Sequence, residues 1–339
     1  MHIPTYWAQA RLRQESRPTH GITVQRWGWS DTSQDAAQAH AEQRARHALD
    51  QALAPGALPR AEPRMEWKNE YSLEGSTPIR EEVLERRGPT VMTRNSYGAR
   101  CLNTEHVAIA DMDLPEPPRH VGFPALSLLL LVLAGTWLAQ LAPHKNTSRM
   151  VALALVALFL VLVLARLSAW WRARQALRRA RATPAFEQAL QRVLAFHGSH
   201  PHWGLRVYET PNGLRVIVTH EALAPEDAQV QALFDALQVD PLYALLCERQ
   251  QCFRARVSAK PWRMGLSGLT TTLRRWPLAA PWLAERQQWA HTYDRQAADY
   301  AACRLVQQLG PVLNCPQAQA FVQWHDDASQ ALRSDLPLA

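Results

Sequence analysis

The sequence predicts an α+β protein, in which a cytoplasmic mixed α/β body is interrupted by a two-helix transmembrane hairpin. Two long uncharged runs lie in the middle of the 339 residues, and strand and helix patterns lie on both sides of them. Over the whole chain, 47% of the residues are apolar, 20% are charged and the mean hydropathy is −0.27. These averages exclude a disordered chain and a polytopic membrane protein, but they do not exclude a membrane anchor.

The two uncharged runs predict the hairpin. The first, 121–143, contains no charged residue and exceeds the roughly 20 residues that cross the hydrocarbon layer. The second, 150–171, is uncharged except for Arg166, whose long side chain can reach the headgroups from near the end of a span. Trp170 and Trp171 stand where an interfacial aromatic belt is expected.

Basic residues predict the orientation of this hairpin. The connecting loop carries only Lys145 and Arg149, whereas the second run ends in an arginine cluster: Arg166, Arg172, Arg174, Arg178, Arg179 and Arg181. Basic residues favour the cytoplasmic side, so we expect a multi-pass protein of the bacterial inner membrane with both termini cytoplasmic. The predicted divisions are 1–120, 121–171 and 172–339. We expect the first and last to pack into one body, with the lipid bilayer as a partner.

The overall charge and the cysteines narrow the remaining classes. The formal charge is +7, and the arginine cluster accounts for most of it. The rest of the chain is therefore close to neutral, and nucleic acid is not an expected partner. The five cysteines form no CxxC pair. We therefore expect free thiols in a reducing compartment rather than a zinc site or a disulfide framework.

Local patterns predict strands and helices in the first region. Those expected before the hairpin are a strand over Gly21–Trp29, a helix from a Ser30–Asp31 N-cap to about Leu53, a hairpin of Glu81–Arg87 and Thr90–Asn95, and a strand over His106–Leu114.

The last region shows the same mixture. Its expected elements are a helix over Pro184–His197, a hairpin of Leu205–Glu209 and Leu214–His220, helices over Pro225–Leu237 and from Asp240–Pro241, and a strand over Cys252–Val257. The remainder is expected to be helical, with an aromatic core stripe at Trp282, Trp289, Tyr293 and Tyr300.

Asp111 and Asp113 are the candidate metal ligands. Alternate residues of a strand project from the same face, so the two carboxylates are expected side by side. Paired carboxylates can hold Mg²⁺ against substrate phosphates. The alternative is that they lie at the exposed end of the strand, either solvated or paired with arginine.

Five basic residues are the candidate ligand-binding set: Arg215, Arg254, Arg256, Lys260 and Arg263. Arg254 and Arg256 share one face of their expected strand, and Arg215 follows the Pro211-Asn212-Gly213 turn. Arginine forks bind phosphate or carboxylate in a bidentate manner. The set can hold a phosphorylated ligand or neutralise the two aspartates in a structural network, and the structural network is the favoured alternative.

Other candidate motifs indicate structure rather than chemistry. His197, His200 and His202 are expected on the surface of a loop, and Asp240 before Pro241 is typical of a helix N-cap. The sequence contains no GxxxxGK[ST], GxSxG, HExxH or GxGxxG motif.

Four segments together resemble uncharacterised two-span inner-membrane proteins of proteobacteria. They are 23–31, 93–104, 206–215 and 253–263, and the resemblance extends over nearly the whole chain. It implies an inner-membrane location and no particular activity.

Asp111 and Asp113 also resemble one element of the archaeo-eukaryotic primase-polymerase core. In that core, a strand ending in Asp-x-Asp is followed by a glycine-containing turn and a strand bearing a histidine. Thr210–Leu214 resembles the turn, and this chain has Arg215 in the place of the histidine.

The expected function is therefore a ligand-binding or scaffolding domain at the inner membrane, with an anionic ligand held by the five basic residues. The alternative is a metal-dependent enzyme that acts on nucleotides or phosphoesters at Asp111 and Asp113. Mg²⁺ is expected as a cofactor only under this alternative.

Overall fold

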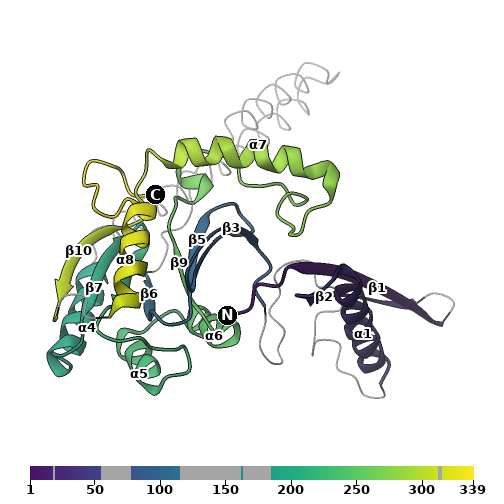
Figure 1. Ribbon diagram of the computed structural model, residues 1–339, viewed down its shortest axis with the longest axis horizontal. Coiled ribbons are helices and arrows are strands. Elements are labelled where there is room, and N and C mark those ends of the chain that lie inside the picture. The colour runs from purple at the N-terminus through teal and green to yellow at the C-terminus, as the bar shows by residue number, and fades with distance from the viewer. Residues whose placement is uncertain (18–19, 55–77, 115–161, 163–184, 312–314) are drawn as a thin grey trace, which may run out of the picture. The chain divides into compact units, whose positions relative to one another are not determined.

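The computed structural model describes residues 1–17, 20–54, 78–114, 162, 185–311 and 315–339. Within these, Met1–Asp113 and Ala189–Ala339 form one compact unit, and Leu114–Gln188 belong to a second. The first unit is a mixed α/β body built on two four-stranded sheets and a two-stranded hairpin (Figure 1). The divisions predicted near residues 120 and 171 lie outside the described residues and stay predictions.

The first four-stranded sheet has the order β3-β4-β5-β9 and is antiparallel throughout. Its strands are β3 (Glu82–Arg87), β4 (Thr90–Arg94), β5 (Arg100–Thr104) and β9 (Phe253–Arg256). Phe253 and Ala255 of β9 are fully buried, whereas Arg254 and Arg256 alternate with them on the other face. This alternation confirms the faces expected from the sequence.

The second four-stranded sheet has the order β10-β7-β8-β6 and is also antiparallel. Its strands are β6 (Ile109–Asp113), β7 (Leu205–Thr210), β8 (Gly213–Val218) and β10 (Arg304–Leu309). Each sheet therefore combines strands from early and late parts of the chain. Every residue of β8 is buried, which explains its nearly continuous apolar sequence.

The two-stranded hairpin of β1 (Tyr6–Arg17) and β2 (His20–Ser30) packs against α1 (Gln34–Leu53), as Figure 1 shows. The contact face of α1 is an alanine stripe at helical spacing, formed by Ala37, Ala41, Ala45 and Ala48. Small side chains let the helix approach the hairpin closely. A Cβ added to Gly28 of β2 would lie 2.1 Å from the backbone nitrogen of Ala41.

The remaining helices follow the hairpins and strands of the last region. They are α4 (Ala185–Ser199), α5 (Ala228–Leu237), α6 (Pro241–Gln250), the 3₁₀ turn η1 (Pro261–Arg263), α7 (Ala280–Ala297) and α8 (Pro316–Ser329). Asp240 is the predicted N-cap of α6, and its side chain accepts from Leu242 N. The cap of α1 is Ser33 rather than the predicted Ser30–Asp31.

Three strands were not predicted from the sequence: β1, β5 and β10. The segment of β10 was expected to be helical, yet it pairs with β7. The predicted aromatic stripe is also only partly internal, because Tyr293 is fully buried whereas Trp282 is 44% exposed.

The predicted fold class and localisation need correction at the transmembrane hairpin. No helix among the described residues is both long enough and apolar enough to cross a membrane. The physical reason is the amphipathic character of these helices: the 20-residue α1 is long enough, but it buries only a stripe of alanines between polar residues. The predicted spans, 121–143 and 150–171, lie outside the described residues except for Leu162. The finding contradicts the predicted hairpin and the multi-pass inner-membrane localisation with cytoplasmic termini. The bilayer partner depended on both.

Candidate functional site

One cavity of about 410 Å³ brings the predicted site residues together. Both four-stranded sheets, α6 and the segment after β9 line it. All seven candidates are among the lining residues: Asp111, Asp113, Arg215, Arg254, Arg256, Lys260 and Arg263. The lining also includes Glu81, Asn95, Tyr97, Asn212 and Tyr243. We call this space the cationic cavity.

Asp111 of β6 and Arg215 of β8 are cross-strand partners in the cavity wall. Arg215 donates from Nε to Asp111 Oδ1 at 3.0 Å and from Nη2 to Oδ2 at 3.1 Å. This bidentate geometry is the strong form of an arginine–carboxylate pair. Burial on its own would lower the pKa of Arg215, but the Asp111 carboxylate, together with Cys303 and Tyr243, outweighs it and raises this pKa. The guanidinium therefore stays charged, and Asp111 is engaged through both oxygens.

Arg215 also makes buried contacts outside this ion pair. Arg215 Nη1 donates to the Arg256 carbonyl at 2.9 Å and lies 3.4 Å from His325 Nε2. His325 is fully buried on α8, and its Nε2 lies 3.8 Å from Cys303 Sγ. Burial would raise the pKa of Cys303, but the neighbouring His325, together with Arg215 and Ser329, outweighs it and lowers this pKa. Arg215 therefore contacts both Asp111 in the cavity wall and the buried polar groups around His325.

Asp326 of α8 contacts three other side chains in this buried polar region. Asp326 accepts from Arg206 Nη2 at 2.6 Å and from the Tyr208 hydroxyl at 2.7 Å, and its Oδ1 lies 3.0 Å from His325 Nδ1. Arg206 and Tyr208 lie on β7, beside which α8 is drawn in Figure 1. We call Arg206, Tyr208, His325 and Asp326 the β7–α8 cluster.

Glu81 and Arg254 form a second ion pair in the cavity wall. Arg254 Nη2 donates to Glu81 Oε2 at 2.6 Å, and the two side chains are 16% and 5% exposed. Thr93 Oγ1 also donates to Glu81 Oε2 at 2.7 Å. Glu81 directly precedes β3, and sequence reasoning did not include it in the site. Its partner lies 173 residues away, so no local pattern signals the pair.

The other three basic residues follow one another closely at the end of β9. Arg256 is on the strand, Lys260 precedes η1 and Arg263 ends it. Arg256 Nη1 donates to the Ser258 carbonyl at 2.6 Å. In the described part of the chain, no carboxylate oxygen lies within 4.0 Å of the Arg256 guanidinium. One short segment therefore presents three cationic side chains to the cavity.

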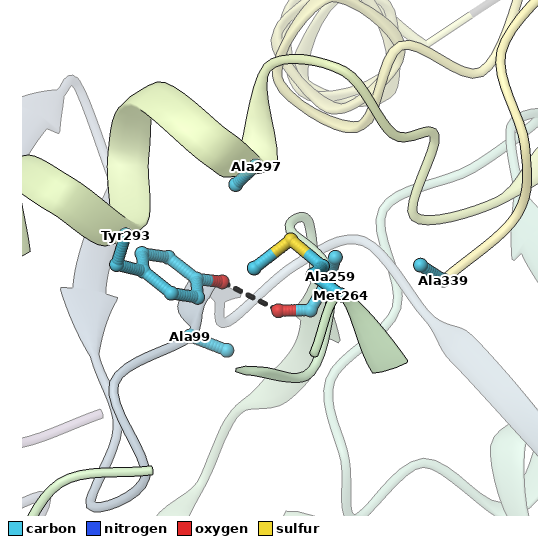
Figure 2. Close-up of a cluster of buried hydrophobic side chains, with 6 residues drawn as sticks. All are labelled: Ala99, Ala259, Met264, Tyr293, Ala297 and Ala339. Carbon is cyan, nitrogen blue, oxygen red and sulfur yellow. Dashed lines mark hydrogen bonds between the residues drawn. The ribbon is translucent and has the colours of Figure 1, made fainter. Parts of the chain in front are cut away.

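A hydrophobic cluster fixes this segment in place (Figure 2). Ala259 and Met264 pack against Tyr293 and Ala297 of α7, and the Tyr293 hydroxyl donates to the Ala259 carbonyl at 2.6 Å. Lys260 and Arg263 lie between these two anchored positions in sequence. The cationic residues are therefore carried by a short segment that is buried at both ends, which limits their freedom.

The turn between β4 and β5 supplies an aromatic ring to the same cavity. Asn95 Oδ1 accepts from the backbone nitrogens of Tyr97 and Ala99, which holds the turn. Tyr97 lines the cavity, and its ring lies 5.4 Å from that of Trp262. Burial raises the pKa of Tyr97 to about 12. Its hydroxyl is therefore neutral at physiological pH and can donate to a ligand.

The strand register explains why one of the two predicted metal ligands has an arginine as its cross-strand neighbour and the other does not. Asp111 lies opposite Arg215, whereas Asp113 lies opposite Gly213, which has no side chain. In the described part of the chain, no group of three or more His, Cys, Asp or Glu side chains is arranged to hold a metal ion. A cation at Asp111 would also lie beside the Arg215 guanidinium, which repels it. The arrangement therefore favours an anion over a metal ion in the cavity.

Comparisons with known proteins add no further identification. The chain matches no protein-family model, no curated protein and no solved structure. The resemblance to two-span membrane proteins and to the primase-polymerase core stays a prediction. The function is therefore inferred from the residues of the cationic cavity.

Proposed function

We propose that this protein binds a small anionic molecule in the cationic cavity, through phosphate or carboxylate groups. One observation carries the proposal: among the described residues, five basic side chains and three carboxylates line a single cavity. Two of those carboxylates, Glu81 and Asp111, are already engaged by Arg254 and Arg215. The excess positive charge is directed into the cavity by the segment that contains Arg256, Lys260 and Arg263.

The size and composition of the cavity suit a small molecule. A volume of about 410 Å³ lies within the range of about 300–1,000 Å³ that is common for ligand pockets. Arginine presents a planar fork that matches phosphate and carboxylate oxygens, whereas lysine contributes a point charge. The Tyr97 hydroxyl, which lines the same cavity, can complete the hydrogen bonding of such a ligand.

Isothermal titration calorimetry of the full chain with pyrophosphate tests this proposal. We expect saturable binding that weakens as the salt concentration rises, because exposed ionic contacts are screened. Arg256→Gln and Arg263→Gln should each lower the affinity by about tenfold, since a hydrogen bond to a charged group contributes about 1.5–3 kcal/mol. Arg333→Gln is the matched control, because Arg333 pairs with Asp335 on the exposed surface and does not line the cavity.

Two outcomes would contradict the proposal. The first is pyrophosphate binding that both cavity variants, Arg256→Gln and Arg263→Gln, leave unchanged, which would place the anion elsewhere. The second is tight binding of Mg²⁺ alone that Asp111→Asn abolishes, which would favour the metal-dependent enzyme instead. The thermal midpoint of each variant shows whether a lost affinity reflects a lost fold.

A further inference from the structure

Among the described residues that line the cationic cavity, Asp113 is the carboxylate outside the two ion pairs. Glu81 is paired with Arg254 and Asp111 with Arg215, and all four side chains line the cavity. Burial and the Asp111 charge raise the pKa of Asp113, whereas the Lys260 charge and the Asn212 side chain oppose this rise. Among the described residues, no basic nitrogen lies within 4.0 Å of its carboxylate oxygens. It is therefore a carboxylate without a direct ion pair among the described residues, in a cavity lined by five basic side chains.

The backbone accounts for this difference between the two aspartates. β6 and β8 pair so that Asp111 is opposite Arg215 and Asp113 is opposite Gly213. Gly213 follows Asn212 in the tight turn between β7 and β8 and provides no side chain to contact Asp113. The carboxylate consequently faces the cavity rather than a cross-strand neighbour.

An unpaired carboxylate weakens the binding of a ligand that is only anionic. Like charges repel, and the repulsion grows as water is displaced from the cavity. The same carboxylate strengthens the binding of a ligand that carries a positive group beside its anionic group. Lys260, Arg256 and Arg263 line the same cavity as Asp113, so one small molecule can contact both kinds of charge.

We propose that the ligand of the cationic cavity is a small zwitterion, in which Asp113 binds an ammonium group while the segment of Arg256, Lys260 and Arg263 binds a phosphate. This assignment rests on the proposed anion-binding function and names the class of molecule that the site selects. Asp113 is then the residue that determines specificity. The ammonium donates to its carboxylate.

A pair of probes of nearly equal shape tests the assignment. In 2-aminoethyl phosphate an ammonium replaces the terminal methyl of n-propyl phosphate, and both carry the same phosphate. Calorimetry of the full chain should show about tenfold or more tighter binding of the aminoethyl compound, because a charged hydrogen bond is gained. In Asp113→Asn this preference should fall to about twofold or less.

The Asp113→Asn variant has a second expected effect that a structural role would not produce. It should bind n-propyl phosphate more tightly than the native chain does, because the repulsion is removed. Asp235→Asn is the matched control. Asp235 is exposed on α5, outside the cavity, and its replacement should preserve the native preference. Thermal unfolding of both variants controls for the fold.

The outcomes separate this assignment from the function on which it rests. Equal binding of both probes by the native chain, or a preference that survives in Asp113→Asn, overturns the zwitterion assignment and leaves anion binding intact. Absence of binding of either phosphate overturns the anion-binding function, and the zwitterion assignment with it.

Discussion

The β7–α8 cluster and the cationic cavity both bring arginines together with carboxylates, but in different proportions. In the β7–α8 cluster, one buried arginine, Arg206, is matched by one carboxylate, Asp326, and a tyrosine and a histidine complete the hydrogen bonding. Among the described residues that line the cavity, five are basic and three are carboxylates. A matched set can stabilise the fold without a ligand, whereas an unmatched set has capacity left for one.

The two regions are also connected through one side chain. Arg215 pairs with Asp111 in the cavity and approaches His325 of the β7–α8 cluster within 3.4 Å. A variant in one region can therefore be measured for its effect on the other. We expect changes in the cluster to alter stability and changes in the cavity to alter binding.

The largest expected effect follows from Asp326→Ala. The substitution leaves the buried Arg206 without its carboxylate, which costs about 3–5 kcal/mol of the free energy of unfolding. Urea unfolding at neutral pH measures the loss. The double variant Arg206→Met with Asp326→Leu should recover part of it, because both charges are then removed. A single-variant loss below about 1 kcal/mol would place Asp326 outside the stabilising cluster.

The pH dependence of the same aspartate gives a second prediction. Burial would raise the pKa of Asp326, but hydrogen bonds from His325 and Tyr208, with the charges of His325 and Arg206, outweigh it and lower this pKa. The stabilisation is therefore present above the unfolded value of about 3.9 and is lost as the pH falls through the lower folded value. The stability difference between the native chain and Asp326→Asn should shrink over this acidic range. A difference that grows on acidification would contradict the assignment.

A smaller effect is expected from changing the balance of charge in the cavity. Glu81→Gln leaves Arg254 without a carboxylate but keeps an oxygen that can accept from Thr93. The cavity then gains net positive charge, and we expect about fivefold tighter pyrophosphate binding with a modest loss of stability. Calorimetry and thermal unfolding measure the two effects. Weaker binding in Glu81→Gln would show that the ion pair, rather than the charge excess, shapes the site.

The smallest effect concerns the exposed pair of Arg333 and Asp335, whose side chains are 58% and 60% exposed. Surface ion pairs contribute little because water screens them. Arg333→Gln should therefore leave both the thermal midpoint and pyrophosphate binding unchanged. A measurable change in either would show that exposure alone does not separate neutral from functional arginines in this protein.

Local periodicity in the sequence was sufficient to predict which candidate side chains share a face of their strand. Alternation placed Asp111 with Asp113 and Arg254 with Arg256, and the turn before Arg215 was also predicted. All seven candidate residues line one cavity: five lie on β6, β8 and β9, and Lys260 and Arg263 lie at η1 after β9.

Contacts between distant parts of the chain were not accessible to the same reasoning. Glu81 and Arg254 are 173 residues apart, and Arg206 and Asp326 are 120 residues apart. Their meeting depends on tertiary packing rather than on any local pattern. The same holds for β10. Its segment was predicted to be helical, but in the structure it forms a strand that pairs with β7. Local propensity is a weak guide to secondary structure where pairing with a distant strand determines the conformation.

Crystals of the full chain soaked with tungstate would test the central claim most directly, since this dense phosphate analogue is located by its anomalous scattering. We expect one strong tungsten peak inside the cationic cavity, with oxygens at hydrogen-bonding distance, about 2.7–3.2 Å, from Arg256 or Arg263. The peak should disappear in Arg256→Gln crystals and persist in Arg333→Gln crystals. A peak confined to other surfaces, with the cavity free of anion at saturating tungstate, would contradict this claim.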